Sequence, residues 1–173
     1  LSPIHSFKDS KYTLLVSEHL FKKGNLAVDE HFHPYVDSSH YPKVRKGETL
    51  PRHIRSYLGH LYYYYPAGTP ILTVPFVAII NLFTDSAVIA PDGRYRPSVD
   101  RFWQKKIASM LVSVACLFLY SAAIQMLGLK VSWLIAFSAG LSTQFWSTAS
   151  RGLQAHTWIV VLLSVTLFLI VRA

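Results

Sequence analysis

The last 67 residues of the chain, 107–173, contain no acidic side chain and only three permanent charges, at Lys130, Arg151 and Arg172. These charges separate three uncharged runs, which cover 107–129, 131–150 and 155–171. The first run would be about 35 Å long as a helix, more than the hydrocarbon core of a bilayer, which is about 30 Å thick. We therefore predict three transmembrane helices, over about 107–129, 131–150 and 155–172.

The hydrophobic residues, 51% of the chain, are gathered into blocks rather than spread at the spacing of a soluble core. All nine acidic residues lie in the first 106 positions. We therefore expect an all-α polytopic membrane protein rather than a water-soluble globule. Its parts would be an exported loop over 1–106 and a three-helix transmembrane region over 107–173.

Two segments of the predicted loop have helical character. Residues 10–22 place Tyr12, Leu15, Val16 and Leu20 on one face, with Glu18 elsewhere, which predicts an amphipathic helix that ends near Gly24. The apolar stretch over about 70–84 is too short to cross a bilayer and contains Pro75, so we expect an interfacial helix. Both would be juxtamembrane helices.

The net charge of +8 suggests a nucleic-acid partner, but the details argue against one. The first 106 residues contain 14 Lys and Arg against nine acids, no basic run is longer than two, and no nucleic-acid motif occurs. Contact with anionic lipid head groups or with a phosphate-bearing substrate explains the charge with fewer assumptions.

Two charge rules disagree about orientation. Arg101, Lys105 and Lys106 beside the first span favour a cytoplasmic loop, whereas a loop of about 100 residues can be exported whatever its charge. Lys130 in the short turn and Arg172 would then be cytoplasmic, so we expect the loop on the exported side. The chain begins at Leu1 without Met, and we expect further membrane helices before and after it, or partner subunits.

Asp9 is the first candidate for chemistry. It lies between a predicted preceding membrane helix and the helix over 10–22, beside Lys8 and Lys11. Partial burial would raise the basicity of its carboxylate, which could act as a general base on an acceptor hydroxyl. The alternative is that Asp9 or Ser10 simply caps the helix.

For each of the other candidate residues, the sequence allows two interpretations. His31 and His33, with Asp29 and Glu30 nearby, could bind a divalent metal ion, or they could be surface side chains. Arg52, Arg55 and His60 could bind a phosphate, or they could belong to a solvated basic loop. Arg151 and His156 lie at the predicted mouth of the bundle, where Arg151 could bind a phosphate or extend to lipid head groups.

The order of these features resembles the N-terminal part of the C-type membrane glycosyltransferases. The features are the opening Lys8–Tyr12, the amphipathic helix, the aromatic-proline element Tyr62–Pro70, the short apolar helix and the Ser-Arg pair at 150–151. The likeness is closest to the bacterial branch similar to the dolichyl-phosphate-mannose and aminoarabinose transferases. It would place the chain in a bacterial inner membrane.

The resemblance implies an inverting transfer of a sugar from a polyprenyl-phosphate donor, with Asp9 as the general base. It implies a phosphate-facing role for Arg151, and we add Arg52, Arg55 and His60 as further donor-phosphate ligands. Tyr64, Tyr65 and His156 would lie at the substrate mouth. Many relatives have an acid and a basic-Pro-Pro element where this chain has Tyr64–Pro70, so we assign no metal ligand, and use of a divalent ion stays open.

The expected function is therefore a membrane glycosyltransferase or the N-terminal portion of one, acting on an exported-side acceptor. The alternative is a non-catalytic membrane subunit built on the same scaffold. A transporter fits less well, because ion coupling usually needs acidic residues within the spans.

Overall fold

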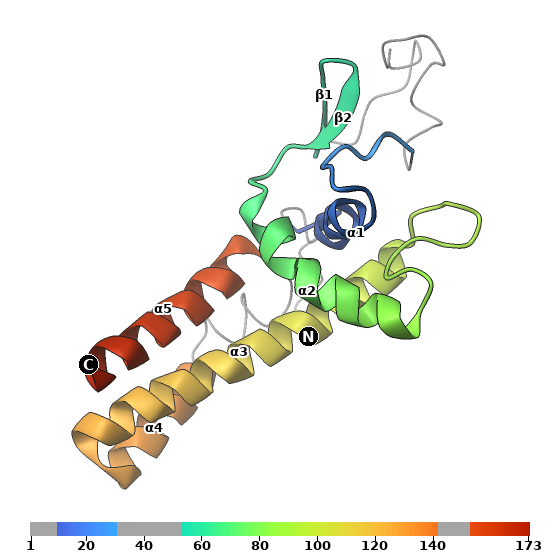
Figure 1. Ribbon diagram of the computed structural model, residues 1–173. Helices are drawn as coiled ribbons and strands as arrows, with labels where there is room; N and C mark the ends of the chain where they lie inside the picture. Colours follow the sequence, from blue (N-terminus) through green and yellow to red (C-terminus); the bar gives the residue numbers. More distant parts are fainter. Residues whose placement is uncertain (1–9, 31–52, 142–152) are drawn as a thin grey trace. The chain divides into compact units, whose positions relative to one another are not determined.

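The computed structural model describes residues 10–30, 53–141 and 153–173. These residues form five helices and one two-stranded sheet, so the protein is mostly helical (Figure 1). The chain divides into two compact units, Leu1–Arg101 and Phe102–Ala173, and the boundary falls inside the third helix.

The first unit begins with helix α1, Thr13–Lys23. It ends at Gly24, whose positive φ of 69° lets its N–H donate to the carbonyl of Leu20, as the sequence predicted. The cap predicted at Ser10 is wrong, because the N-cap residue is Tyr12, which has a φ of 73° and makes no side-chain cap bond. Asp9, the other predicted cap, lies outside the described residues.

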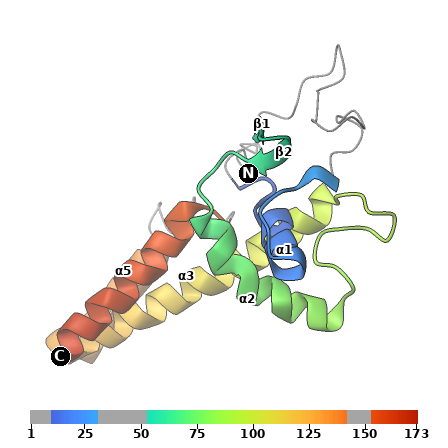
Figure 2. The same cartoon turned by 45° about the horizontal axis from the view of Figure 1, so that its top comes forward.

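Helix α2, Gly68–Phe83, packs against α1, and the two helices lie side by side in Figures 1 and 2. Thr73, Val77 and Ile80 recur at helical spacing on the buried face of α2. The hydroxyl of Ser17 lies 2.9 Å from the carbonyl oxygen of Pro70 and so joins the two helices. The α1 residues from Thr13 to His19 are all buried, which makes α1 a core helix rather than an amphipathic surface helix.

The expectation of an all-α protein is wrong at the aromatic segment. Strands β1, Ile54–Tyr57, and β2, His60–Tyr63, form an antiparallel hairpin. Its two-residue turn, Leu58 and Gly59, has positive φ at both positions. Residues 27 and 28 bond to β2 as well, since the N–H of Val28 donates to the carbonyl of Leu61 at 2.9 Å.

The second unit contains the rest of α3, Pro97–Leu127, with α4, Leu129–Leu141, and α5, Ala155–Arg172. Gly128, with a φ of 75°, separates α3 from α4. Helices α3 and α4 approach closely, because a Cβ on Gly140 would lie 3.4 Å from Sγ of Cys116. Helices α3 and α5 meet through Phe118 and Phe168, whose ring centroids are 5.5 Å apart.

Two helices in the described part of the chain, α3 and α5, are long and apolar enough to cross a membrane. Helix α3 begins ten residues before the predicted span at 107, so it includes the basic positions 101–106. Helix α4 has 13 residues, about 20 Å, and is shorter than a bilayer core. Three transmembrane helices are therefore not seen among the described residues, and residues 142–150 of the predicted middle span, 131–150, lie outside them.

Candidate functional site

One face of the hairpin collects basic and aromatic side chains. The register places Arg55 opposite Tyr62 and Tyr57 opposite His60. Because side chains alternate along a strand, these four residues share one face, while the buried Ile54 and Leu61 lie on the other. The N–H of Tyr64 donates to the carbonyl of His53 at 2.9 Å, which continues the register. We call this set the outer face: Arg55, Tyr57, His60, Tyr62 and Tyr64.

The cation of the outer face is positioned by an aromatic ring. The guanidinium carbon of Arg55 lies 5.4 Å from the ring centroid of Tyr64, within the range of a cation–π contact. Tyr64 itself is 65% exposed. No ion pair links Arg55 to any residue among those described. Its N–H groups can therefore donate hydrogen bonds to an external anion while the guanidinium rests against the Tyr64 ring.

The imidazole of the outer face has a carboxylate partner that the sequence analysis did not assign. Nδ1 of His60 lies 2.8 Å from Oδ2 of Asp29, and Oδ1 of Asp29 accepts the N–H of Leu61. Asp29 is thus fixed by β2 on one side and orients the imidazole on the other. This geometry leaves Nε2 of His60 directed away from its carboxylate partner, as a group that can exchange a hydrogen bond with a ligand.

Behind the outer face, tyrosine rings form a row that runs into the unit. Between ring centroids, Tyr65 lies 5.3 Å from Tyr63, Tyr63 lies 6.5 Å from Tyr12, and Tyr12 lies 5.1 Å from Tyr95. A cavity of about 50 Å³ lies beside Tyr63 and Tyr65, against α1 and α2. Its walls are formed by Val16, Leu26, Tyr62, Tyr63, Tyr65, Ala67 and Pro70. The volume suits a few water molecules and is too small for a sugar ring with its substituents.

The row ends on a buried carboxylate. The hydroxyl of Tyr95 donates to Oδ2 of Asp100, which is 1% exposed. Burial, and then the charge of Asp100, raise the pKa of Tyr95 far above its ordinary value of 10.0. A backbone hydrogen bond from Tyr12 acts in the opposite direction. Tyr95 therefore stays neutral and ties the unusual backbone at Tyr12 to the start of α3.

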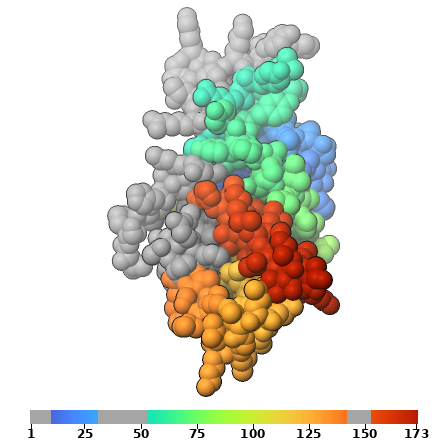
Figure 3. Space-filling model, turned by 90° about the vertical axis from the view of Figure 1, so that its left-hand side faces the viewer, coloured from blue at the N-terminus to red at the C-terminus, as the bar shows by residue number. Residues whose placement is uncertain are grey.

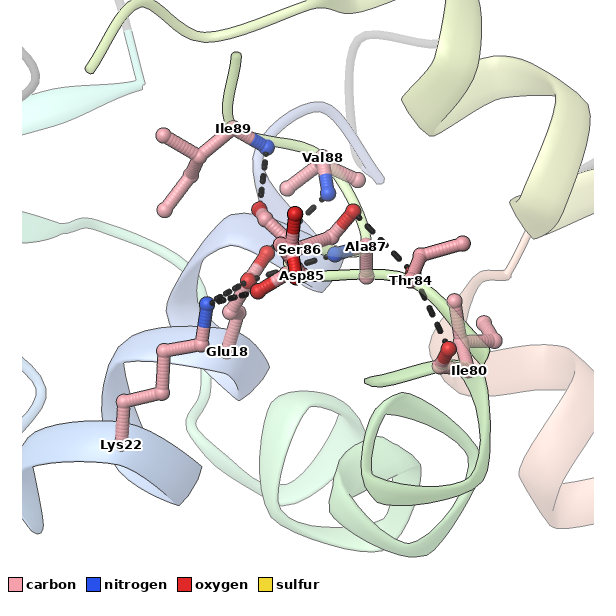
Figure 4. Close-up of polar contacts among 9 residues, drawn as sticks. All are labelled: Glu18, Lys22, Ile80, Thr84, Asp85, Ser86, Ala87, Val88 and Ile89. Carbon is pink, nitrogen blue, oxygen red and sulfur yellow. Dashed lines mark hydrogen bonds and ion pairs between the residues drawn. The ribbon is translucent and has the colours of Figure 1, made fainter. Parts of the chain in front are cut away.

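Glu18 is a buried acid that the sequence analysis placed away from the apolar face. It is fully buried, and its oxygens accept the N–H groups of Ala87 at 3.2 Å and Val88 at 3.0 Å (Figure 4). Nζ of Lys22 lies 2.7 Å from the same carboxylate and also donates to the carbonyl of Asp85. This cluster, which we call the Glu18 clamp, fastens the segment after α2 onto α1. A Glu and a Lys at i and i+4 are the only local signal for it.

The other predicted site residues are distributed as follows. Asp9, Arg52 and Arg151 lie outside the described residues. Arg55, His60 and Tyr64 come together on the outer face, and Tyr65 makes an edge-to-face contact with Tyr64, with ring centroids 6.0 Å apart. His156 is exposed in the first turn of α5, in the second unit. Among residues 10–30, 53–141 and 153–173, no group of three His, Cys, Asp or Glu side chains could hold a metal ion.

The hairpin is accessible in the molecule. In the space-filling view its teal atoms reach the surface (Figure 3). Tyr57 is 67% exposed. The outer face therefore presents exposed aromatic rings, a cation that forms no ion pair with a described residue, and an oriented imidazole. Comparison with protein-family models, with curated proteins and with solved structures finds no match.

Proposed function

We propose that this chain belongs to an integral membrane glycosyltransferase, or forms the N-terminal portion of one. The enzyme would transfer a sugar from a polyprenyl-phosphate donor to an acceptor on the exported side, with inversion at the anomeric carbon. Two apolar helices long enough to span a bilayer support a membrane location. The order of elements before them supports the transfer.

The observation that carries the proposal is the place of Asp9 in the sequence. It directly precedes Ser10–Tyr12, the turn that leads into the buried helix α1. Helix α1 packs against α2, which contains no charged residue over its 16 positions. A base at the start of a rigid helix pair, next to an apolar helix that can face lipid, suits a substrate with a polyprenyl tail and a polar head.

The chemistry needs a base on one side and positive charge on the other. Asp9 would take the proton of an acceptor hydroxyl as that oxygen forms its bond to the anomeric carbon. The bond from this carbon to the phosphate oxygen would break, and the electron pair would leave with the polyprenyl phosphate. Attack opposite the leaving phosphate gives inversion. Cations near the departing phosphate stabilise the charge that develops on it.

Four residues are assigned to the leaving phosphate: Arg52, Arg55, His60 and Arg151. Arg55 is available to bind the phosphate, because its guanidinium rests on Tyr64 and forms no ion pair with a described residue. Since Asp29 holds His60, this imidazole could donate from Nε2 when protonated.

The decisive experiment is transfer from polyprenyl-phosphate mannose, glucose and arabinose by the full-length gene product in native membranes. Asp9→Asn should lower turnover by about 100-fold or more, because a general base contributes about two to four orders of magnitude. Asp92→Asn is the matched control, since Asp92 is exposed in a turn and should keep activity. Equal thermal stability of both variants must be shown. Activity of Asp9→Asn within about threefold of the parent would reject the role of Asp9 as base.

A second candidate function is a non-catalytic membrane subunit, and one observation favours it. Leu58 at the hairpin turn is 78% exposed and has a backbone φ of 47°, which residues other than glycine rarely adopt. A strained and exposed apolar residue offers a contact point for a partner protein. In that case Asp9→Asn would have no effect, whereas Leu58→Gly would weaken co-purification of the partner.

A further inference from the structure

The outer face has the composition of a carbohydrate-binding surface. Tyrosine rings can stack against the C–H face of a sugar ring, and polar groups beside the rings can bond to its hydroxyls. Tyr57 and Tyr64 are both exposed by about two thirds, at 67% and 65%. Arg55, His60 and Asp29 supply donors and acceptors beside these rings. This pairing of flat rings with fixed polar groups needs a ligand with both an apolar face and many hydroxyls.

The charge of the outer face indicates an anionic ligand. His60 and Asp29 form a pair with each other, so they add little net charge when the imidazole is protonated. Arg55 is the unbalanced charge, since no described acid forms an ion pair with it. A guanidinium with free N–H groups binds phosphate or carboxylate through two parallel hydrogen bonds. A saccharide that carries such a group satisfies both parts of the surface.

Two other classes of ligand fit less well. Nucleic acid binding needs several cations along a phosphate backbone, and the outer face has only Arg55 and His60. A membrane surface would accept Arg55 and the tyrosines, but it offers no reason for an oriented Asp29–His60 pair. That pair is fixed by the N–H of Leu61 and can make directional bonds with hydroxyl groups.

We propose that the outer face binds an anionic glycan, with sugar rings on Tyr57 and Tyr64, its phosphate or carboxylate on Arg55, and a hydroxyl on Nε2 of His60. Arg55 and His60 are diagonal neighbours across the strand pair, at a typical spacing of about 7–8 Å, which matches adjacent substituents of a short saccharide better than one small anion. That this glycan is the acceptor of the transfer rests on the proposed function; Arg55 and His60 would then contact the acceptor, which leaves Arg52 and Arg151 for the leaving phosphate. Glycan binding itself does not depend on the proposed function.

The test uses the full-length chain in nanodiscs of neutral phosphatidylcholine. The probes are short oligosaccharides from the envelope of the organism that encodes the chain, separated by anion exchange into acidic and neutral pools and labelled for fluorescence anisotropy. The acidic pool should bind more tightly than the neutral pool. Arg55→Gln and Tyr64→Ala should each weaken binding of the acidic pool about tenfold, as expected for losing a charged hydrogen bond or a stacked ring.

Matched variants separate binding from folding. Tyr64→Phe keeps the ring and should bind within about threefold of the parent. Ser56→Ala lies on the same hairpin but on the opposite face, and should leave binding unchanged. Asp9→Asn should bind the acidic pool like the parent even if transfer is lost, so failure of the proposed function and failure of glycan binding are distinguishable.

Several results would overturn the proposal. One is equal binding of acidic and neutral pools, and another is parent-like binding by Arg55→Gln and Tyr64→Ala. Failure of both pools to bind would also overturn it. Binding only to vesicles of anionic phospholipid, or only to a single-stranded oligonucleotide, would assign the outer face to a membrane or to nucleic acid instead.

Discussion

Nζ of Lys22 lies 2.7 Å from Oε1 of Glu18, one turn earlier on α1, and the Glu18 carboxylate is fully buried while Lys22 is partly exposed. The same carboxylate accepts two N–H groups from the segment after α2. Three bonds to one buried acid replace the water that it loses on burial. The Glu18 clamp therefore joins α1 to the segment after α2 through polar contacts within the first unit.

Removal of the clamp should destabilise the protein strongly. Glu18→Ala leaves the N–H groups of Ala87 and Val88 without their acceptor and Lys22 without its partner. We expect a loss of about 3 kcal/mol of unfolding free energy, and a smaller loss for Glu18→Gln. The measurement is thermal unfolding in detergent, followed by circular dichroism.

Glu30→Gln is the control for that experiment, because Glu30 forms an exposed pair with Lys23. Its effect should stay within about 0.5 kcal/mol. If Glu18→Ala were no more destabilising than Glu30→Gln, the clamp would have no energetic role.

Relief of strain at the hairpin turn should stabilise the protein. Leu58 holds a φ of 47° and is 78% exposed, so its side chain adds strain and buries little surface. Leu58→Gly should raise the unfolding free energy by about 0.5–1 kcal/mol. Gly59→Ala, at a φ of 84°, should lower it. A decrease with Leu58→Gly would show that the leucine makes stabilising contacts, and thermal unfolding of both variants decides the matter.

The raised pKa of Tyr95 leads us to expect that the folded protein loses stability at alkaline pH. Its pKa is raised in the folded protein, so its contribution is fully present below its ordinary pKa of 10.0 and is lost as the pH rises above it, because only the unfolded state ionises there. The unfolding midpoint of Tyr95→Phe should therefore fall less steeply above pH 10 than that of the parent. Tyr57→Phe, at an exposed position, should keep the slope of the parent. Identical slopes for Tyr95→Phe and the parent would contradict the assignment.

The uncovered side of α2 should contact lipid. Ile79 and Leu82 are 55% and 80% exposed and lie opposite the buried Val77. Spin labels at these two positions, in a Cys116→Ser background, should be more accessible to oxygen than to a water-soluble nickel complex. A label at Tyr57 on the hairpin should show the reverse. Low access of both reagents at Leu82 would mean that protein covers this side.

The orientation can be tested by cysteine labelling in the same background. Asp92→Cys lies in the loop expected on the exported side, and Lys130→Cys lies in the first turn of α4, just after Gly128, which separates α3 from α4. A membrane-impermeant maleimide should label Asp92→Cys in intact spheroplasts and Lys130→Cys only after permeabilisation. The opposite pattern would place the first unit in the cytoplasm.

Local patterns predicted the helices well where one kind of residue dominates a segment. The apolar run before Lys130 indicates α3, and the apolar run after Arg151 indicates α5, because a long uncharged stretch has few alternatives to a helix in lipid. Gly24 indicates the end of α1, since glycine adopts a positive φ without strain. The hairpin was missed because its turn is Leu58-Gly59 and lacks the Asn-Gly or Asp-Gly pair that signals such a turn.

The sequence by itself determined the division into a charged first part and an apolar second part, because composition sets the preference of a segment for water or lipid before any packing. Only the tertiary structure decided that Glu18 is buried, that Asp29 holds His60, and that Arg55 rests on Tyr64 beside an open aromatic face. The bonds from Glu18 and Asp29 join residues about 30 to 70 positions apart in the chain, and their energies depend on local water exclusion, which no local pattern of residues encodes.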